Sequence, residues 1–112
     1  MRLAIIGSRT LSIKNIGQYL PQGVTEIVSG GARGIDTAAA EYAKANGFVF
    51  TEFSPDYAQF KKSAPLKRNL KIAQYADAVL AFWDGISKGT MQTVTLFKKL
   101  NKPSTVILLR NK

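Results

Sequence analysis

Short runs of apolar, mostly β-branched residues recur along the chain and are separated by segments with helical spacing. The five runs cover residues 3–6, 26–29, 48–53, 78–82 and 105–109. Because the runs are continuous rather than alternating, they predict parallel strands in a sheet that is covered on both faces. Right-handed connections then predict an α/β fold, a Rossmann-like three-layer α/β/α sandwich whose five-stranded parallel sheet has the order 3-2-1-4-5.

Helices are predicted between the strands from caps, apolar stripes and stop residues. The four segments cover residues 12–20, residues 35–47, a stretch that starts after Pro65, and a stretch that starts near Thr90 and ends before Pro103. Prolines or glycines close most of these segments, as expected for helix ends. With 112 residues and no repeat or linker, the chain should form one domain over residues 1–112.

The third helix gives a sharper expectation when its residues are wound at about 100° each. Its buried stripe should consist of Leu66, Leu70, Ala73 and Ala76. Asn69 falls inside this stripe, and a buried amide without partners costs about 1–3 kcal/mol, so Asn69 should bond a loop backbone or a ligand. Arg68 lies at the edge of the stripe and could direct its guanidinium along a crevice. The alternative is a structural Asn69 and a solvated Arg68.

Positive charge is in excess, since 16 Lys and Arg residues face seven Asp and Glu residues, for a formal charge of +9. Such a field attracts phosphorylated ligands or polyanions, although it also serves solubility alone. Five basic residues cluster in residues 61–71 near Tyr57 and Phe60, a pattern that favours an anionic contact such as single-stranded nucleic acid. The longest irregular stretch, residues 54–64, is a candidate lid or rim of a site, or a structural crossover loop.

Cysteine and histidine are both absent. Their absence excludes disulfides, thiol nucleophiles, imidazole-dependent triads and Cys-based zinc sites, and no metal site is expected. Any catalytic acid or base would be Asp, Glu, Lys or Tyr. No apolar run approaches the roughly 20 residues of a membrane span, and the N-terminal run is too short for a signal peptide. We therefore expect a cytoplasmic protein without a membrane partner.

Glycine-rich loops follow three of the predicted strands, at the edge of the sheet where ligands of such folds bind. The candidate contacts to a ligand or its phosphate, together with Arg68 and Asn69, are Gly7, Ser8, Arg9, Ser29, Gly30, Gly31, Arg33, Gly34, Asp36, Asp84, Gly85, Ser87, Gly89 and Thr90. Glycine lets the backbone approach a ligand, and exposed N–H groups at a helix start bind anions. The alternative for these glycines is tight turns and close packing of strand on helix.

Three side chains in or next to these loops each have two possible roles. Asp36 either caps its helix or accepts a ribose hydroxyl. Asp84 either takes part in chemistry or ribose binding, or belongs to an ordinary Asp-Gly turn. Trp83 either stacks on a base or packs in the core or an interface. The chain lacks the Gly-x-x-x-x-Gly-Lys-Ser/Thr string, so a P-loop ATPase is not indicated.

Four motifs occur along the chain in the order Gly7-Ser8-Arg9, Ser29-Gly30-Gly31-x-x-Gly34, Lys67-Arg68-Asn69 and Gly85-x-x-x-Gly89-Thr90. In this order they resemble the SLOG superfamily, which includes the LOG phosphoribohydrolases and the Rossmann-like domain of the DNA-processing protein Smf/DprA. The resemblance spans nearly the whole chain and looks closest to small stand-alone members of unknown function. It implies a small phosphorylated nucleotide-like ligand, with Arg68 matching the arginine of the LOG and DprA motifs. Family members commonly self-associate, so a homo-oligomer through Trp83 or the fourth helix is a further expectation.

One departure from the LOG pattern bears on catalysis. LOG enzymes carry a glutamate after two further residues beyond the Gly-Thr pair, and Thr93 stands at that place here. Threonine neither steadies an oxocarbenium-like charge nor activates water well. We therefore expect a nucleotide-binding or nucleotide-sensing domain that requires no cofactor. The alternatives are a LOG-like nucleoside-monophosphate phosphoribohydrolase, with Arg68 and Asp84 as its catalytic residues, and a DprA-like single-stranded nucleic-acid binder.

Overall fold

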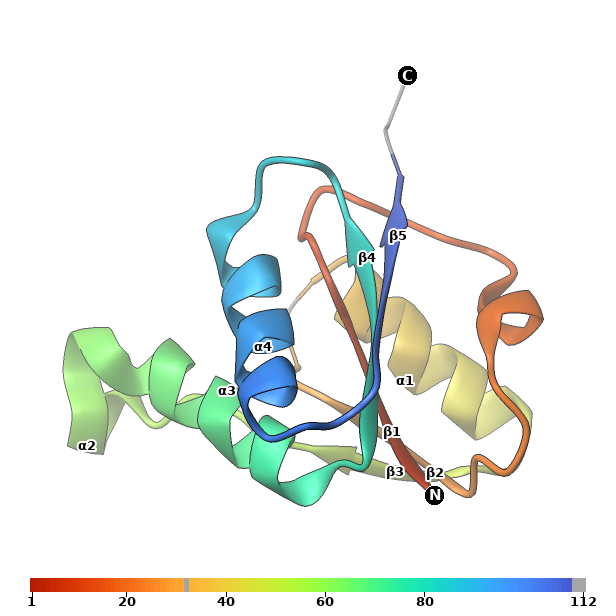
Figure 1. Ribbon diagram of the computed structural model, residues 1–112, viewed down its shortest axis with the longest axis horizontal. Helices are drawn as coiled ribbons and strands as arrows, with labels where there is room; N and C mark the ends of the chain where they lie inside the picture. Colours follow the sequence, from red (N-terminus) through yellow and green to blue (C-terminus); the bar gives the residue numbers. More distant parts are fainter. Residues whose placement is uncertain (32, 110–112) are drawn as a thin grey trace.

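A five-stranded parallel sheet forms the centre of the computed structural model, which describes residues 1–31 and 33–109 (Figure 1). The strands are β1 (Arg2–Gly7), β2 (Glu26–Ser29), β3 (Val49–Glu52), β4 (Ala78–Trp83) and β5 (Ser104–Leu108). Every neighbouring pair is parallel, and the order is β3-β2-β1-β4-β5. The predicted strand order is therefore confirmed. Most strand ends differ from the predicted ones by one residue, and the others agree.

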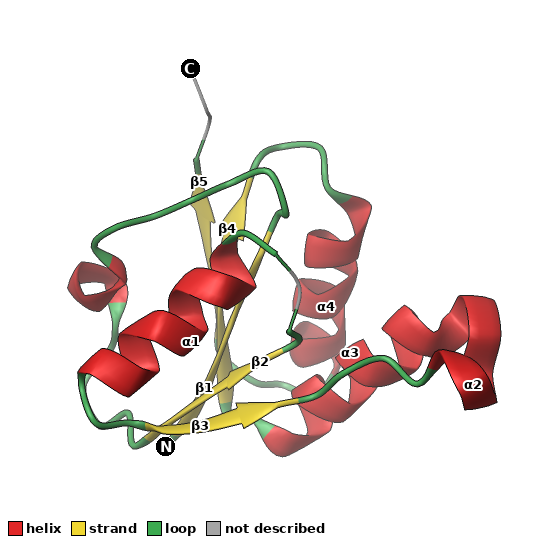
Figure 2. Ribbon diagram, turned by 180° about the vertical axis from the view of Figure 1, so that it is seen from behind, coloured by secondary structure: helices red, strands yellow, loops and turns green. Residues whose placement is uncertain are grey.

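Helices cover both faces of this sheet. They are α1 (Ile35–Ala45), α2 (Tyr57–Phe60), α3 (Ala64–Tyr75) and α4 (Lys88–Lys99), with short 3₁₀ helices at Ile16–Tyr19 and Lys61–Ser63. α1 lies on one face, and α3 and α4 lie together on the other (Figures 1 and 2). The three-layer α/β/α sandwich is confirmed. Among the described residues, no helix has the length and apolar character needed to cross a membrane.

The core has two parts because successive residues of a strand point to opposite faces of the sheet. Leu3 and Ile5 of β1 face α1 and are buried with Phe82 of β4. Ala4 of the same strand faces the other layer and packs with Phe97 of α4. The continuous apolar pattern of β1 and β4 follows from this double burial.

The strand order reverses between β1 and β4. The chain leaves β1 toward β2 and α1, and it leaves β4 toward α4 and β5, so the two loops separate and open a crevice at the C-terminal edge. Gly7 ends β1 at this point, because an added Cβ would lie 2.5 Å from the Ile35 side chain and 2.6 Å from the Phe82 carbonyl oxygen. The glycine thus lets α1 begin directly beside the crevice.

The predicted first helix over residues 12–20 was wrong, since only the 3₁₀ turn Ile16–Tyr19 forms there. The segment instead crosses the sheet as a loop and inserts Leu11 and Ile16 into the core on the α1 side. Gly17 packs closely on α1, where an added Cβ would lie 2.7 Å from the Tyr42 hydroxyl. A regular helix was disfavoured because glycine lies in its middle and the loop has to span the sheet.

Residues 54–64 are more ordered than predicted. They contain α2 and the 3₁₀ helix Lys61–Ser63, and the Asp56 carboxylate accepts a hydrogen bond of 3.1 Å from the Gln59 N–H at the start of α2. α2 projects from the body of the molecule next to the start of α3 (Figure 1).

The buried stripe predicted for α3 was only partly right. Leu66 and Leu70 are 41% and 37% exposed, whereas Asn69, Ile72 and Ala73 are buried. The first turns of α3 extend past the sheet toward α2, away from the strands that bury its later turns (Figure 1). Helical periodicity predicts which side chains share one face of α3. Which of these side chains are buried depends on how far the sheet extends beneath the helix.

Lys102 closes the C-terminal end of α3 from the loop before β5. Its Nζ donates to the carbonyl oxygens of Ala73, Gln74 and Ala76 at 2.7, 3.1 and 2.8 Å. These carbonyls have no partner within the helix. The positive charge of Lys102 also interacts favourably with the negative end of the helix dipole.

We expect Lys102→Met to lower the free energy of unfolding by about 1–2 kcal/mol, because it removes charge-assisted bonds and keeps the apolar stem. Urea denaturation at neutral pH measures this change. The matched control is Lys71→Met on the exposed side of α3, which should change stability by no more than about 0.5 kcal/mol. Equal effects of the two substitutions would contradict a capping role for Lys102.

Candidate functional site

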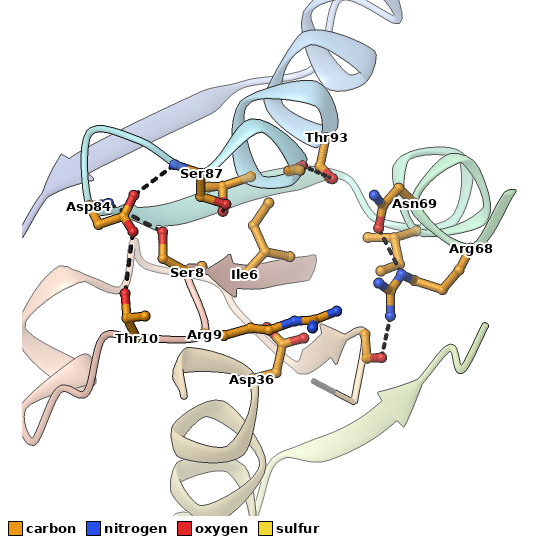
Figure 3. Close-up of a pocket in the computed structure, with 15 residues that line it drawn as sticks. Ile6, Ser8, Arg9, Thr10, Asp36, Arg68, Asn69, Asp84, Ser87 and Thr93 are labelled. Carbon is orange, nitrogen blue, oxygen red and sulfur yellow. Dashed lines mark hydrogen bonds between the residues drawn. The ribbon is translucent and has the colours of Figure 1, made fainter. Parts of the chain in front are cut away.

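A cavity of about 370 Å³ opens at the crevice between the C-terminal ends of β1 and β4 (Figure 3). Its size falls within the usual range for small-molecule sites, and its place is the one that parallel α/β sheets use for ligands. The lining residues come from six separate segments of the chain: Ile6, Gly7, Ser8, Arg9, Thr10, Gly30, Asp36, Arg68, Asn69, Ile72, Asp84, Ser87, Gly89, Thr90 and Thr93. Eleven of the 16 candidate contacts predicted from the sequence are among them.

Asp84 joins the loops after β1 and β4. One carboxylate oxygen, Oδ1, accepts hydrogen bonds from the N–H groups of Ile86 and Ser87, both at 2.8 Å. The other, Oδ2, accepts from the Thr10 hydroxyl at 3.3 Å, and the Asp84 N–H donates to the Ser8 Oγ at 3.2 Å (Figure 3). The carboxylate therefore holds the turn before α4 against the first loop.

These contacts determine what Asp84 can do chemically. The two loop N–H groups, that of Ser87 first, lower the pKa of Asp84 below its ordinary value because they stabilise the ionised form. A carboxylate that is ionised at neutral pH and engaged at both oxygens is poorly suited to act as a general acid. Among residues 1–31 and 33–109, moreover, no three acidic side chains gather into a group that could hold a metal ion.

The lowered pKa of Asp84 predicts how the stability of the protein changes at acidic pH. A carboxylate with a depressed pKa in the folded state stabilises the protein above its ordinary pKa of 3.8, and this contribution is lost as the pH falls through the lower folded value. Asp84→Asn should therefore be less stable than the wild type at neutral pH, and the difference should shrink on acidification. Urea midpoints measured from about pH 6 to about pH 2.5 test this, and a difference that stays constant over that range would contradict it.

The start of α4 offers an anion site. Ser87, Gly89 and Thr90 line the cavity there, and the first turn of the helix contains no acidic residue. The first N–H groups of a helix lack partners within it and carry the positive end of the helix dipole. A Cβ added to Gly89 would meet no atom within 4 Å, so packing within the protein does not require glycine at this position. The space beside Gly89 is therefore open.

Arg68 forms the opposite wall of the cavity. Its Nε donates to the Asn69 Oδ1 at 2.7 Å and its Nη1 donates to the Gly30 carbonyl oxygen (Figure 3). Asn69 is buried as predicted, at 8% exposed, but its described partner is the Arg68 side chain rather than a loop backbone or a ligand. Partial burial lowers the pKa of Arg68, an effect that the nearby Asp36 carboxylate opposes. Arg9 extends along the mouth of the cavity toward Arg68.

Asp36 and Thr93 complete the polar lining. Asp36 lies in the first turn of α1, is 6% exposed and lines the cavity. Thr93 is buried and donates from its hydroxyl to the Gly89 carbonyl oxygen at 3.0 Å. That bond lies within α4, so Thr93 adds a hydroxyl and no carboxylate to the lining of the site.

Five predicted contact residues lie outside this cavity: Ser29, Gly31, Arg33, Gly34 and Gly85. Gly31 and Arg33 line a smaller hollow beside it. Gly34 begins α1 and packs on the backbone of residues 8–11, and Gly85 has φ +89° in the turn before α4. Ser29 is fully buried at the end of β2. Ala32, in the same glycine motif, lies outside the described residues.

Four lining residues were not among the predicted contacts: Ile6, Thr10, Ile72 and Thr93, the last of which the sequence had singled out only as a departure from a motif. The two isoleucines belong to apolar patterns that indicate core, and only the position of Ile6 at the end of a strand could have identified it as a cavity wall. Thr10 sits next to the Gly7-Ser8-Arg9 motif, and that position was its only signal.

Comparisons with protein-family models, with curated proteins and with solved structures found no match to this chain. The similarity to the SLOG superfamily therefore stays a prediction from the four motifs.

Proposed function

We propose that this chain is a binding or sensing module for a nucleotide or nucleotide derivative, which it holds in the cavity between β1 and β4. The observation that carries the proposal is the convergence of an open helix start with two arginines on one crevice. Arg9 and Arg68 supply positive charge, and Gly89 leaves the start of α4 accessible. The motifs that resemble the SLOG superfamily support the same ligand class.

The other walls suit the rest of a nucleotide. In the proposed arrangement the phosphate accepts hydrogen bonds from the first turn of α4 and from the hydroxyls of Ser87 and Thr90. Ile6 and Ile72 give an apolar wall for the sugar or base, and the Asp36 carboxylate accepts a ribose hydroxyl. A site with a few placed polar groups and an apolar wall is what small-molecule recognition requires.

Binding without turnover fits the carboxylates better than hydrolysis does. Asp84 is engaged in the turn before α4, and Thr93 bonds within its own helix. Neither group is free to activate water at a glycosidic carbon, as a phosphoribohydrolase would need. We expect no release of base when the protein is incubated with nucleoside monophosphates.

A thermal-shift screen at one moderate salt concentration tests the proposal. The ligands are nucleoside mono-, di- and triphosphates, cyclic nucleotides, NAD and ADP-ribose, with inorganic phosphate as the control. A ligand at a hundred times its dissociation constant stabilises by about 2.7 kcal/mol, which raises the midpoint of a domain this size by several degrees. A selective rise with one nucleotide class supports the proposal, and no rise with any of them contradicts it.

Single-stranded nucleic acid is a second candidate, and one surface favours it. Lys61, Lys62, Lys67 and Lys71 are all exposed along α3 and the turn before it, and Tyr57 is 56% exposed nearby. Basic residues beside an aromatic ring form the usual contact surface for single strands. This candidate requires oligonucleotide binding whose affinity falls steeply as salt is raised, and absence of binding at low salt excludes it.

A further inference from the structure

A second hollow adjoins the main cavity on the side away from α4. It has a volume of about 240 Å³ and is lined by Arg9, Gly30, Gly31, Arg33, Pro55, Tyr57 and Arg68. Arg9, Gly30 and Arg68 line both spaces, so the two lie side by side. Its outer wall comes from the residues just before and at the start of α2, which makes α2 part of the rim.

The charge of this hollow differs from that of the main cavity. The main cavity contains two arginines and two carboxylates, those of Asp36 and Asp84. Three arginines and no carboxylate line the second hollow. Two acidic groups lie near it without lining it: Glu52, whose carboxyl would lie 2.8 Å from a Cβ added at Gly31 and accepts a hydrogen bond from Ser54, and Asp36, whose Oδ2 would lie 3.2 Å from a Cβ added at Gly30. The second hollow therefore favours an anion more strongly than the first.

Arg68 divides the two spaces. An added Cβ at Gly30 would lie 2.6 Å from its Nη1, so the absence of a side chain at Gly30 lets the guanidinium lie flat on the loop after β2. The bonds that the structure describes use its Nε–H and one N–H of Nη1. A guanidinium carries five N–H groups, so three are left for ligands on either side.

Partial burial of the Arg68 guanidinium costs free energy. Desolvation lowers the pKa of Arg68, and only Asp36 among the carboxylates opposes it. A partly desolvated guanidinium gains more from an anion than a fully hydrated one does. An anion placed against Arg68 from the second hollow would offset the cost of burying it.

We infer that the second hollow is a subsite for a second phosphate group of the same nucleotide, held by Arg9, Arg33 and Arg68. The inference rests on the proposed function and narrows its ligand class to nucleotides with two phosphate groups. The second phosphate either follows the first, as in a 5′-diphosphate, or lies on the other side of the ribose, as in a 3′,5′-bisphosphate. Both kinds of nucleotide place a second phosphate on the side of Arg68 that faces the second hollow. The experiment distinguishes the two kinds.

The experiment is calorimetric titration of the full chain at one fixed salt concentration. The ligands are the four ribonucleoside 5′-monophosphates, the matching 5′-diphosphates and the matching 3′,5′-bisphosphates. They are titrated into the wild type, Arg33→Ala and Lys44→Ala. Arg33 lines the second hollow and not the main cavity. Lys44 is exposed in the last turn of α1, so the control removes the same charge at a remote place.

The wild type should bind one of the two-phosphate ligands at least about tenfold more tightly than the monophosphate with the same base, which is about 1.4 kcal/mol. Arg33→Ala should reduce this gain to about threefold or less and leave monophosphate affinity unchanged, while Lys44→Ala should keep the full gain. Equal affinities in the wild type, or a gain that Arg33→Ala keeps, would overturn the inference and leave the proposed function standing. A wild type that binds no nucleotide contradicts both.

Discussion

Replacement of Gly34 by alanine should cause the largest loss of stability of any change considered for this chain. Gly34 begins α1 with φ +76° and ψ −119°, a conformation open almost only to glycine. An added Cβ would also lie 2.7, 2.8 and 2.9 Å from the carbonyl oxygens of Arg9, Leu11 and Ser8. Because these are backbone atoms, they cannot move aside as a flexible side chain would. We expect a loss of about 3 kcal/mol or more, measured by urea denaturation.

The matched control is Gly89→Ala, which also changes a glycine next to a helix start at the crevice. Gly89 has no positive φ, and a Cβ there meets no atom within 4 Å. Its substitution should raise the free energy of unfolding by less than about 1 kcal/mol, because alanine favours helix more than glycine does. Similar losses for the two variants would mean that Gly34 is not a structural requirement of the loop.

The second large effect is expected at Arg68, where Arg68→Met should weaken nucleotide binding by about 30-fold or more, or about 2 kcal/mol. Methionine keeps the length and apolar stem of the side chain but removes the charge and all five donors. The bonds to Gly30 and Asn69 are also lost, so a small decrease in stability accompanies the effect. Calorimetric titration of both proteins with the nucleotide that stabilises the wild type most measures the change.

Lys67→Met is the control for the general positive field. Lys67 precedes Arg68 on α3, is exposed, and lies with its Nζ 5.8 Å from the centre of the Phe60 ring rather than in the cavity. Its removal takes away the same charge, so it should change affinity by no more than about threefold at moderate salt. If both variants lose affinity equally, long-range attraction rather than direct contact explains the binding.

The sheet could be predicted because its signal is local and strong. Continuous apolar runs identify buried parallel strands, and the handedness of the connections limits their order. The loop after β1 could not be predicted in the same way. Its apolar residues Leu11 and Ile16 are buried by the sheet and α1, and that contact depends on the tertiary path of the chain.

The site could be predicted only in part, because glycine occurs both where a cavity is open and where the backbone conformation requires it. Gly30 and Gly89 line the main cavity, whereas Gly34 and Gly85 are needed by the backbone. A sequence shows that glycine is present and does not show whether a ligand or a neighbouring chain segment occupies the space beside it. The same limit applies to Asp84, for which the sequence left a role in a turn and a role in chemistry open, and only the structure shows the turn contacts.

The central claim is that a nucleotide binds at the crevice between β1 and β4, and amide chemical-shift mapping by NMR tests it most directly. The ¹⁵N-labelled protein is titrated with the nucleotide that gives the largest thermal shift. The largest saturable shifts are expected for the amides of residues 7–10, Gly30 and residues 87–90. Shifts confined to the basic residues 61–71, or no saturable shift at the crevice, would contradict the account.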